Sequence, residues 1–272
     1  MKVIVSGKGG SGKSTLAAML ATALQNIGYR VLLVDADESN FGLHRLMGVS
    51  YPVSLLDSLG GKKGFRGKMV SPFFQGSEAG FFRDGMSIDE IPESCIAQTD
   101  GIRLLVIGKI HHFGEGCACP MGALSKLILS KLDIKDNEIV IIDTAAGVEH
   151  FGRGVDAAGD LILGIVDPTY ESFLLAKNMQ QMAARAEIEI FFILNKIDEQ
   201  NKTFMIQNIG DQKVVAVIPK NDMIYMDNLA GKKLQTHLKE IDTVCRLIED
   251  FKNNRKGYIH ERTHCNRSIF SE

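Results

Sequence analysis

One glycine-rich segment near the amino terminus has the composition and spacing of a phosphate-binding loop. Residues Gly7–Ser14 fit the pattern G-x-x-x-x-G-K-S/T between a predicted strand and a predicted helix, the context that this pattern requires. Glycines let the backbone wrap around phosphate oxygens with its N–H groups pointing inward, and the start of the helix adds a partial positive charge. We expect Lys13 to reach the β- and γ-phosphates and the Ser14 hydroxyl to ligate Mg²⁺. The segment therefore predicts a nucleoside triphosphate site rather than a flexible turn.

Three carboxylates follow predicted strands at positions suited to that magnesium ion. Asp35 and Asp37 come at the end of the strand Val31–Val34. Asp143 closes the strand Ile139–Ile142, as a Walker B acid does. Carboxylates at the carboxyl ends of strands in an open α/β sheet face the ligand crevice. A single Asp is as often a helix N-cap or a loop acid, but three strand ends converging on one crevice favour a magnesium site, with Asp143 binding the ion through water.

Cys117 and Cys119 form a second chemical feature, because two thiolates one residue apart can converge on one soft metal ion. One chain fills only two of four tetrahedral positions, and a two-fold dimer supplies the other two, since identical residues meet at its axis. We therefore predict one Cys₄ site per homodimer, occupied by Zn²⁺ or Ni²⁺ and less favourably by an iron–sulfur cluster. The alternative is a pair of unligated thiols in a loop.

The other cysteines and several histidines are weaker candidates for chemistry. We expect three cysteines to be small core or surface residues: Cys95, Cys245 and Cys265. His111 and His112 lie just upstream of the cysteine pair, either as auxiliary metal ligands or as ordinary surface residues. His260 and His264 form, with Cys265, a loose cluster near the carboxyl terminus that has low expected metal affinity.

These residues require a sheet that presents the ends of its strands along one edge. Short apolar runs rich in Val and Ile are typical of buried parallel strands. Seven are predicted, at Val3–Val5, Val31–Val34, Leu104–Ile107, Ile139–Ile142, Leu161–Val166, Ile190–Leu194 and Val214–Ile218. Helical patterns separate them at Ser14–Asn26, Gly122–Lys131, Ser172–Arg185 and Thr236–Lys252. This alternation predicts an α/β fold with a doubly wound, mainly parallel sheet and helices on both faces.

The chain is expected to form a single nucleotide-binding domain over residues 1–252, because strands with nucleotide motifs run from Val3 to Pro219 without a break. Residues 60–92 interrupt the alternation, since they are rich in Gly, Phe and charge without a clear period. We predict an inserted loop there, either functional or merely tolerated. Residues 253–272 are polar and basic, and we expect a loosely held tail.

Composition disfavours several classes of function. The 272 residues carry 31 Lys and Arg against 33 Asp and Glu, a net charge of −2, whereas a nucleic-acid-binding protein normally has a basic excess. No apolar run reaches the roughly 18 residues that cross a bilayer, and the amino terminus lacks the apolar stretch of a signal peptide. We expect a cytoplasmic protein that binds neither nucleic acid nor membrane, with its five cysteines reduced.

An extra lysine inside the phosphate loop, Lys8, adds a resemblance to a known class. Its pattern Lys-Gly-Gly-x-Gly-Lys-Ser resembles the deviant Walker A motif of the nitrogenase iron protein, MinD, ParA and arsenic-pump ATPases, a class of P-loop NTPases. The resemblance implies that Lys8 crosses a dimer interface to the partner's nucleotide, where its charge acts like an arginine finger. It also implies that Asp37 orients the attacking water and that Asp35 supports the Mg²⁺ shell, although Glu38 replaces the usual Pro. Asp143–Gly147 resembles the class's switch II.

Base recognition has two interpretations. Asn195–Asp198 follows a predicted strand with the Asn-Lys-x-Asp spacing of GTPases, in which the Asp reads guanine. In the deviant Walker A class an Asn at this strand end contacts adenine, and a loop after Ile-Pro, here Ile218–Pro219, packs on the base. Lys8 favours that class and hence ATP with Mg²⁺, and GTP is the alternative. The expected nucleotide contacts are Gly9, Gly10, Ser11, Gly12, Lys13, Ser14, Thr15, Asn195 and Pro219.

Four segments resemble one branch of this class, the CooC-type ATPases that insert nickel into carbon monoxide dehydrogenase. They are Ile107–Ile110, Gly114–Met121, Ala146–Gly154 and Val166–Ser172. The resemblance implies a dimeric ATPase that binds nickel at Cys117 and Cys119 and matures a Ni–Fe–S client. That client would be carbon monoxide dehydrogenase, acetyl-CoA synthase or another nickel enzyme.

Two other functions remain open at this level. A MinD- or ParA-like ATPase of spatial organisation would bind membrane or DNA, but the tail shows no amphipathic stripe and the net charge is not basic. An iron–sulfur ATPase of the nitrogenase iron protein type would place a cluster at the cysteine pair. The occupant of the cysteine site therefore separates the three functions.

Overall fold

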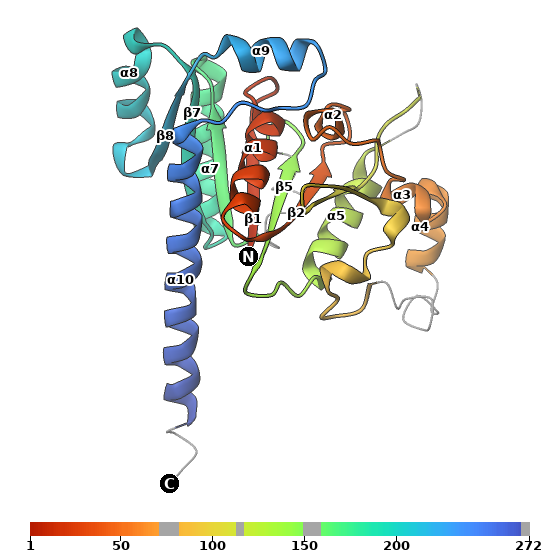
Figure 1. The fold of residues 1–272 in the computed structure, drawn as a ribbon. Helices are drawn as coiled ribbons and strands as arrows, with labels where there is room; N and C mark the ends of the chain where they lie inside the picture. Colours follow the sequence, from red (N-terminus) through yellow and green to blue (C-terminus); the bar gives the residue numbers. More distant parts are fainter. Residues whose placement is uncertain (71–81, 113–116, 149–158, 268–272) are drawn as a thin grey trace.

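Figure 1 shows the fold of the chain as a computed structural model. The structure describes residues 1–70, 82–112, 117–148 and 159–267, with side chains described up to residue 68 in the first range and up to residue 254 in the last. Parts of the predicted segments Gly114–Met121 and Ala146–Gly154 therefore lie outside the described residues.

One eight-stranded sheet organises the described residues, with the strand order β3-β4-β2-β5-β1-β6-β7-β8. Every neighbouring pair is parallel except β3 and β4. The strands are β1 (Lys2–Gly7), β2 (Arg30–Ala36), β3 (Ile96–Thr99), β4 (Ile102–Val106), β5 (Glu138–Thr144), β6 (Leu161–Val166), β7 (Glu189–Ile197) and β8 (Val214–Pro219). The predicted doubly wound, mainly parallel sheet is confirmed, and each of the seven predicted strands is present.

Strand β3 is the one that the apolar pattern does not predict. It pairs antiparallel with β4 through a tight hairpin in which Asp100 and Gly101 have φ of 47° and 82°. A two-residue hairpin turn needs this left-handed conformation, and Asp-Gly is a typical sequence for it. The dipeptide between two short runs is therefore the signal that indicates this strand.

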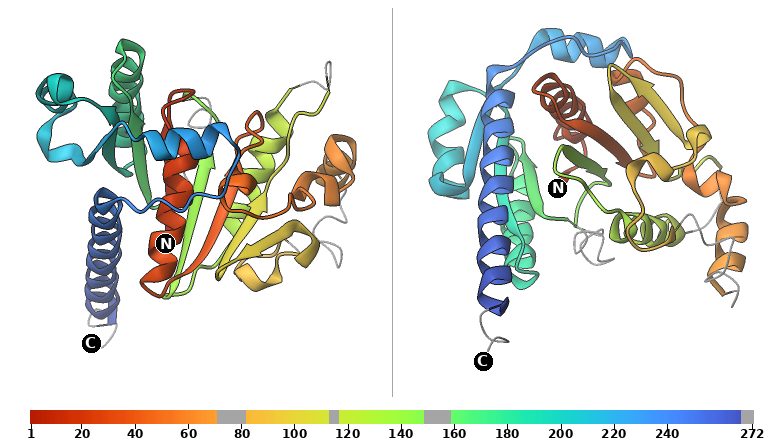
Figure 2. Two further views of the ribbon diagram at one scale, coloured as in Figure 1. Left: turned by 45° about the horizontal axis from the view of Figure 1, so that its top comes forward. Right: turned by 60° about the horizontal axis from the view of Figure 1, so that its bottom comes forward.

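Helices cover both faces of the sheet, as Figure 2 shows. They are α1 (Lys13–Asn26), α2 (Leu43–Leu46), α3 (Leu55–Ser58), α4 (Gly61–Val70), α5 (Cys119–Lys131), α7 (Tyr170–Arg185), α8 (Glu199–Ile209), α9 (Asp222–Leu229) and α10 (Lys239–Arg267), with short 3₁₀ turns at Ile88–Glu90, Glu93–Cys95 and Asp211–Lys213. Successive side chains of a strand point to opposite faces. Val3 and Val5 of β1 therefore join the core of α1 and α10, and Ile4 joins the core of α5 and α7.

The described parts of residues 60–92 include a helix, whereas their composition predicts an inserted loop. Helix α4 occupies Gly61–Val70, and its Phe65 is buried in the same core as α5. Phe82 and Met86 enter that core too, and the Met86 N–H donates to the carbonyl of Lys131 at 3.0 Å. The prediction was wrong because Gly and charged residues mask the few aromatic side chains whose burial decides the structure. Residues 71–81 lie outside the described part.

Helix α10 is longer than predicted. It begins at Lys239 and continues to Arg267, so the backbone is helical through most of the expected tail at residues 253–272. Val244 and Ile248 bury its first half in the core with α1, and Figure 1 shows the second half extending beyond the sheet. In the part of the chain that the structure describes, no helix, α10 included, combines the length and apolarity needed to span a membrane.

Candidate functional site

The phosphate loop connects β1 to α1 and turns at two glycines. Gly10 and Gly12 have φ of 78° and 103°, where a side chain is strained, and a Cβ at Gly12 would overlap Nδ2 of Asn195. Lys13 is the first residue of α1, is only 6% exposed, and donates from Nζ to the carbonyl of Lys8 at 3.2 Å. The loop therefore presents its backbone and a buried cation at the amino end of α1, where phosphate oxygens bind.

The parallel register of β2 and β5 brings two predicted acids together, because Asp35 pairs with Asp143. Asp143 is fully buried, and among the described residues neither of its carboxylate oxygens has a hydrogen-bond partner. Burial and then the nearby Asp35 raise the pKa of Asp143 to about 7, and burial raises the pKa of Asp35 to about 6. A buried acid with two unpartnered oxygens next to the phosphate loop fits a Mg²⁺ ion that arrives with the nucleotide.

The loop after β2 carries Asp37 and reaches back to the phosphate loop. Asp37 Oδ1 accepts hydrogen bonds from the N–H and the Oγ of Ser39, at 2.9 and 2.7 Å. Asn40 donates from Nδ2 to the Oγ of Ser14 at 2.6 Å. Burial lowers the pKa of Lys13, and nearby acids including Asp37 oppose that shift. Asp37 and Ser14 thus line one cavity with Lys13, which suits a water molecule poised against a phosphate.

Lys8 is held within its own chain. Its Nζ donates to Oγ1 of Thr169 at 2.9 Å and lies 3.5 Å from a carboxylate oxygen of Asp167, both in the segment after β6. The Lys8 side chain is 30% exposed, so it remains accessible from outside the chain. Sequence reasoning did not identify this intrachain partner, because the segments are more than 150 residues apart and meet only in the folded sheet.

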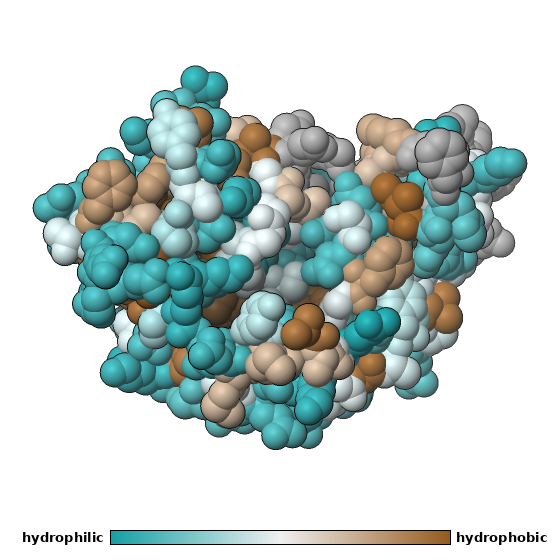
Figure 3. Space-filling view, turned by 90° about the horizontal axis from the view of Figure 1, so that it is seen from above, coloured by the Kyte–Doolittle hydropathy of each residue, from teal (hydrophilic) through white to brown (hydrophobic). Residues whose placement is uncertain are grey.

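One cavity of about 860 Å³ extends from the phosphate loop and Asp37 to Pro219 and helix α9. Figure 3 views the molecule from this side, where polar and apolar side chains are mixed. Of the predicted nucleotide contacts, the cavity is lined by Gly9, Gly10, Gly12, Lys13, Ser14, Thr15, Asn195 and Pro219, whereas Ser11 is buried in the loop. Helix α9 adds Ile224, Tyr225 and Asn228, which sequence reasoning missed because the helix has no buried stripe.

The Asp of the Asn-Lys-x-Asp segment, Asp198, is not placed to contact a nucleotide base. Asp198 caps the amino end of α8 and pairs with Lys220 at 2.8 Å, and it is absent from the cavity lining. Asn195 instead donates to the carbonyl of Ser11 at 2.7 Å, and Lys196 donates to the carbonyl of Gly10 at 2.7 Å. The segment braces the phosphate loop, and an Asp already engaged elsewhere disfavours guanine recognition.

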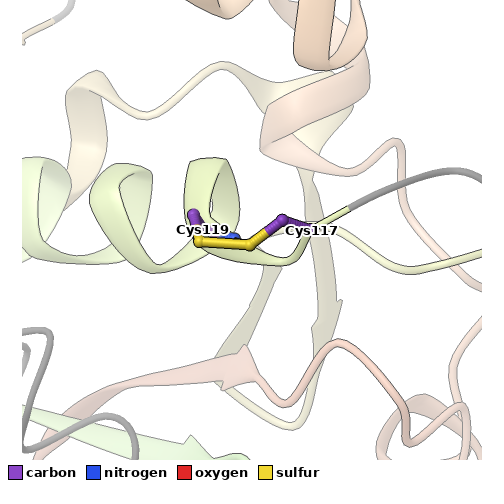
Figure 4. The surroundings of a disulfide bond; sticks show 2 residues. All are labelled: Cys117 and Cys119. Atoms are coloured by element: carbon purple, nitrogen blue, oxygen red, sulfur yellow. A yellow bond between two sulfur atoms is a disulfide. The ribbon is translucent and has the colours of Figure 1, made fainter.

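Cys117 and Cys119 are both exposed and meet at the amino end of α5 (Figure 4). Their sulfurs are joined in a disulfide, with Cα atoms 5.3 Å apart, which corrects the expectation that all cysteines are reduced. The disagreement has a local cause, because the two side chains converge across the first turn of α5, where the Cys119 N–H donates to Cys117 Sγ at 3.1 Å. After reduction the same convergence offers two adjacent thiolates to a metal ion.

The remaining metal-ligand candidates do not gather around that pair. Among the described residues, no group of three or more His, Cys, Asp or Glu side chains is arranged to hold a metal ion. Cys95 and Cys245 are buried, as predicted for small core residues. His111 is exposed, and the centroid of its ring lies 5.5 Å from the centroid of the Phe41 ring. The side chains of His260, His264 and Cys265 lie outside the described residues. Within the part of the chain that the structure describes, the cysteine pair therefore offers two ligands and not four.

Lys109 is a further charged residue that sequence reasoning did not assign to the site. It follows β4, is 2% exposed, and pairs with Asp35 at 2.7 Å. A lysine enclosed in an apolar run at the end of a strand is the signal that could have identified it, because lysine is rarely buried without a partner.

The chain is similar in sequence to known nucleotide-binding proteins. A family described as "CobQ/CobB/MinD/ParA nucleotide binding domain" matches residues 2–234. An uncharacterized ATP-binding protein of Methanocaldococcus jannaschii is 44% identical over 248 residues, covering 91% of this chain and 99% of that protein. The carbon monoxide dehydrogenase accessory protein CooC of Rhodospirillum rubrum is 33% identical over 240 residues, covering 85% of this chain and 88% of that protein.

Solved structures share the fold. The Pyrococcus furiosus cell division ATPase MinD superposes with a TM-score of 0.61 at 20% identity, over 93% of this chain and 98% of that one. The septum site-determining protein MinD of Pyrococcus horikoshii, complexed with Mg-ADP, gives a TM-score of 0.59 at 21% identity, over 85% of this chain and 86% of that one.

Proposed function

Because the chain belongs to the CobQ/CobB/MinD/ParA nucleotide-binding family, whose members are ATPases, we propose that it hydrolyses ATP to carry a thiophilic metal ion, nickel in the first place, to a client metalloenzyme. Cys117 and Cys119 would hold the cargo between two copies of the chain, and the nucleotide would drive those copies together. The client would be a Ni–Fe–S enzyme such as carbon monoxide dehydrogenase or acetyl-CoA synthase.

The hydrolysis step follows from the residues around the cavity. Ser14 Oγ and, through water, Asp35 and Asp143 would hold the Mg²⁺ that accompanies ATP, and the ion would neutralise phosphate charge. Lys13 stabilises the β- and γ-phosphates, and Asp37 orients the attacking water. The water oxygen bonds to the γ-phosphorus as the bond to the β–γ bridging oxygen breaks, which releases ADP and phosphate.

Dimerisation would complete each site, as the deviant form of the loop implies. Lys8 is 30% exposed, and its partners are Thr169 and the buried Asp167, whose carboxylate also accepts from Thr169 and Ser172. It would exchange them for the phosphates of the partner subunit's nucleotide, where added positive charge stabilises the transition state.

One observation carries the metal-binding part, namely the exposed and convergent sulfurs of Cys117 and Cys119 in a chain that offers no complete metal site among its described residues. Two ligands per chain become four at a two-fold axis. The 33% identical relative named as a carbon monoxide dehydrogenase accessory protein supports nickel as the cargo.

The test is metal stoichiometry in the reduced protein. Wild type treated with a thiol-free reductant is expected to bind one Ni²⁺ or Zn²⁺ per two chains on size-exclusion chromatography with ATP. The Cys117→Ser/Cys119→Ser variant should bind none. Cys245→Ala, which removes a buried thiol, is the matched control and should keep the metal. Stoichiometric metal in the double variant would remove the assignment.

The iron–sulfur alternative has one supporting observation. A light-independent protochlorophyllide reductase iron-sulfur ATP-binding protein of Chloroherpeton thalassium is 25% identical over 255 residues, covering 89% of this chain and 85% of that protein. Anaerobic purification followed by analysis of iron and acid-labile sulfide separates the two, because a cluster contains both and a Ni²⁺ or Zn²⁺ thiolate site contains neither. Iron and sulfide that are lost in the cysteine variant would favour the cluster.

A further inference from the structure

We propose that Lys109 is a positioning residue that fixes the hydrolytic loop Asp35–Asn40 to the segment leading to the cysteine pair. Through it, the position of the amino end of α5 sets the rate of ATP hydrolysis. The effect of Lys109 on hydrolysis needs only the ATPase activity, and the response to metal rests on the proposed function.

The ammonium group of Lys109 is enclosed by the hydrolytic loop. Its side chain is 0% exposed, and Nζ lies 2.7 Å from Oδ1 of Asp35. The same nitrogen donates to the carbonyl oxygens of Asp37 and Asn40. An ammonium group has three protons, and these three oxygens accept all of them. The ring of Phe41 lies 5.7 Å from the nitrogen and covers it further. Lys109 therefore holds both ends of the loop that carries Asp37.

Backbone contacts make this attachment rigid. The Ile107 N–H donates to the carbonyl of Asp35 at 3.0 Å, and the Ile110 N–H donates to the carbonyl of Glu38 at 3.0 Å. The first bond closes the parallel pairing of β2 and β4, and the second extends it beyond the ends of both strands. The residues on either side of Lys109 therefore move with the hydrolytic loop.

The cysteine end is joined to the same segment by packing. A Cβ placed on Gly108 would lie 3.2 Å from Cγ of Met121 and 3.0 Å from Cβ of Leu56, so nothing larger than glycine fits there without displacement. Met121 is buried and comes two residues after Cys119, in the first turn of α5. Packed contacts of this kind transmit small displacements, because they leave no free volume to absorb them.

The nucleotide end is joined by one side chain. Asn40, whose carbonyl accepts from Lys109, donates from its amide to Ser14 Oγ at 2.6 Å. Direct contacts thus run from the first turn of α5 through Gly108 and Lys109 to the hydroxyl expected to ligate Mg²⁺. Contiguity alone does not demonstrate coupling, and substitutions along the route are the physical test.

The first experiment measures kcat and the Kd for ADP in three variants. In Lys109→Met, kcat should fall about 100-fold while the Kd for ADP stays within about threefold, because the loop is misplaced and the phosphate loop is intact. Lys109→Arg keeps the charge and should recover part of kcat. Lys213→Met, which removes a surface lysine paired with Glu189, is the matched control and should behave as wild type. Wild-type kcat in Lys109→Met would overturn the proposal.

Lys109→Met leaves Asp35 buried without its partner, so the variant could be unstable. Asn40→Ala removes the hydrogen bond to Ser14 and leaves no buried charge without a partner, so it tests the same contacts in a stable protein. It should lower kcat about tenfold, with ADP binding and the unfolding temperature close to wild type. An Asn40→Ala variant with wild-type kcat would contradict the route through Ser14.

The second experiment compares kcat with and without Ni²⁺ in the reduced protein. Wild type should change its kcat on binding metal, whereas Lys109→Met and Asn40→Ala should bind the same amount of metal with no change. A metal response that persists in both variants, or metal bound to wild type without any response, would overturn the coupling. Wild type that binds no metal would instead remove the proposed function, and the kcat of Lys109→Met would still decide the role of Lys109 in hydrolysis.

Discussion

Lys8 donates from Nζ to Oγ1 of Thr169 of its own chain at 2.9 Å. In the proposed dimer the same lysine reaches the nucleotide bound by the other chain. The contact with Thr169 and the 3.5 Å approach to Asp167 compete with dimerisation, because one ammonium group cannot serve both positions. Asp167 keeps its hydrogen bonds from Thr169 and Ser172 when Lys8 leaves, and the Lys8 side chain is 30% exposed. Lys8 can therefore exchange its intrachain contacts without leaving a buried carboxylate unpartnered.

Thr169→Val removes the acceptor of Lys8 while keeping the shape of the side chain. The dimer should then form with ATP at about five- to thirtyfold lower protein concentration, since two contacts of about 0.5–1 kcal/mol each, one per chain, no longer compete. Analytical ultracentrifugation over a concentration series measures the shift. Lys8→Ala is the counterpart, for which we expect no ATP-dependent dimer and a kcat about 1,000-fold lower. A weaker dimer in Thr169→Val would show that the threonine supports the interface.

The stability of the nucleotide-free protein should fall as pH rises from about 4 to 6, below the range in which the lowered pKa of the Met1 amino group gives the opposite slope. The folded-state pKa values of Asp143 and Asp35, about 7 and about 6, exceed the unfolded value of 3.8. The folded chain therefore binds more protons than the unfolded chain in this pH range. For each proton by which the two states differ, the free energy of unfolding decreases by about 1.4 kcal/mol per pH unit. Thermal unfolding at several pH values measures this slope.

Asp143→Asn provides the matched variant for that slope. It removes the more strongly shifted acid, so the pH dependence should flatten and the unfolding temperature at pH 8 should rise, while Mg²⁺-dependent hydrolysis is lost. Mg-ADP should flatten the slope in wild type as well, because the ion compensates the buried charge. An unchanged slope in Asp143→Asn would exclude this residue as its source.

Asp198→Ala should leave the KM for ATP within about twofold and should not create or remove GTP hydrolysis. The carboxylate caps α8 and pairs with Lys220, so its loss costs about 1 kcal/mol of stability and no base contact. Asn195→Ala should weaken ADP binding about tenfold, because the amide braces the Ser11 carbonyl of the phosphate loop. Competition of GTP against ATP in a steady-state assay measures the first effect, and titration with ADP measures the second. Selective loss of GTP turnover in Asp198→Ala would restore guanine recognition.

Phe65→Ala should destabilise the protein by about 3–5 kcal/mol, although the residue lies in the stretch whose composition predicts a loop. Phe65 is 2% exposed and packs in the core of α5. Urea denaturation gives the change in the free energy of unfolding. Arg66→Ala, at the neighbouring exposed position, should stay within about 0.5 kcal/mol of wild type. If both variants are equally stable, Phe65 does not contribute to the core and α4 is a surface insertion.

The sheet and the phosphate loop follow from local patterns. Strands buried on both faces must be apolar throughout, so β1, β5 and β6 are legible in the sequence. Strand β3 was not legible, because it is short and only partly buried at the edge of the sheet. Helix α9 was not predicted either, because it buries no residues and its sequence therefore has no periodic apolar stripe.

By itself, the sequence determined the nucleotide chemistry, because a phosphate loop is one continuous segment whose glycines and lysines act at fixed spacing. Only the tertiary structure decided which distant groups act on it. The register of β2 and β5 places Asp35 beside Asp143, and the packing of the segment after β4 buries Lys109 against the hydrolytic loop. Such contacts join residues far apart in the chain, and no local spacing encodes them. They arise when the whole sheet assembles and the strand ends meet at one edge.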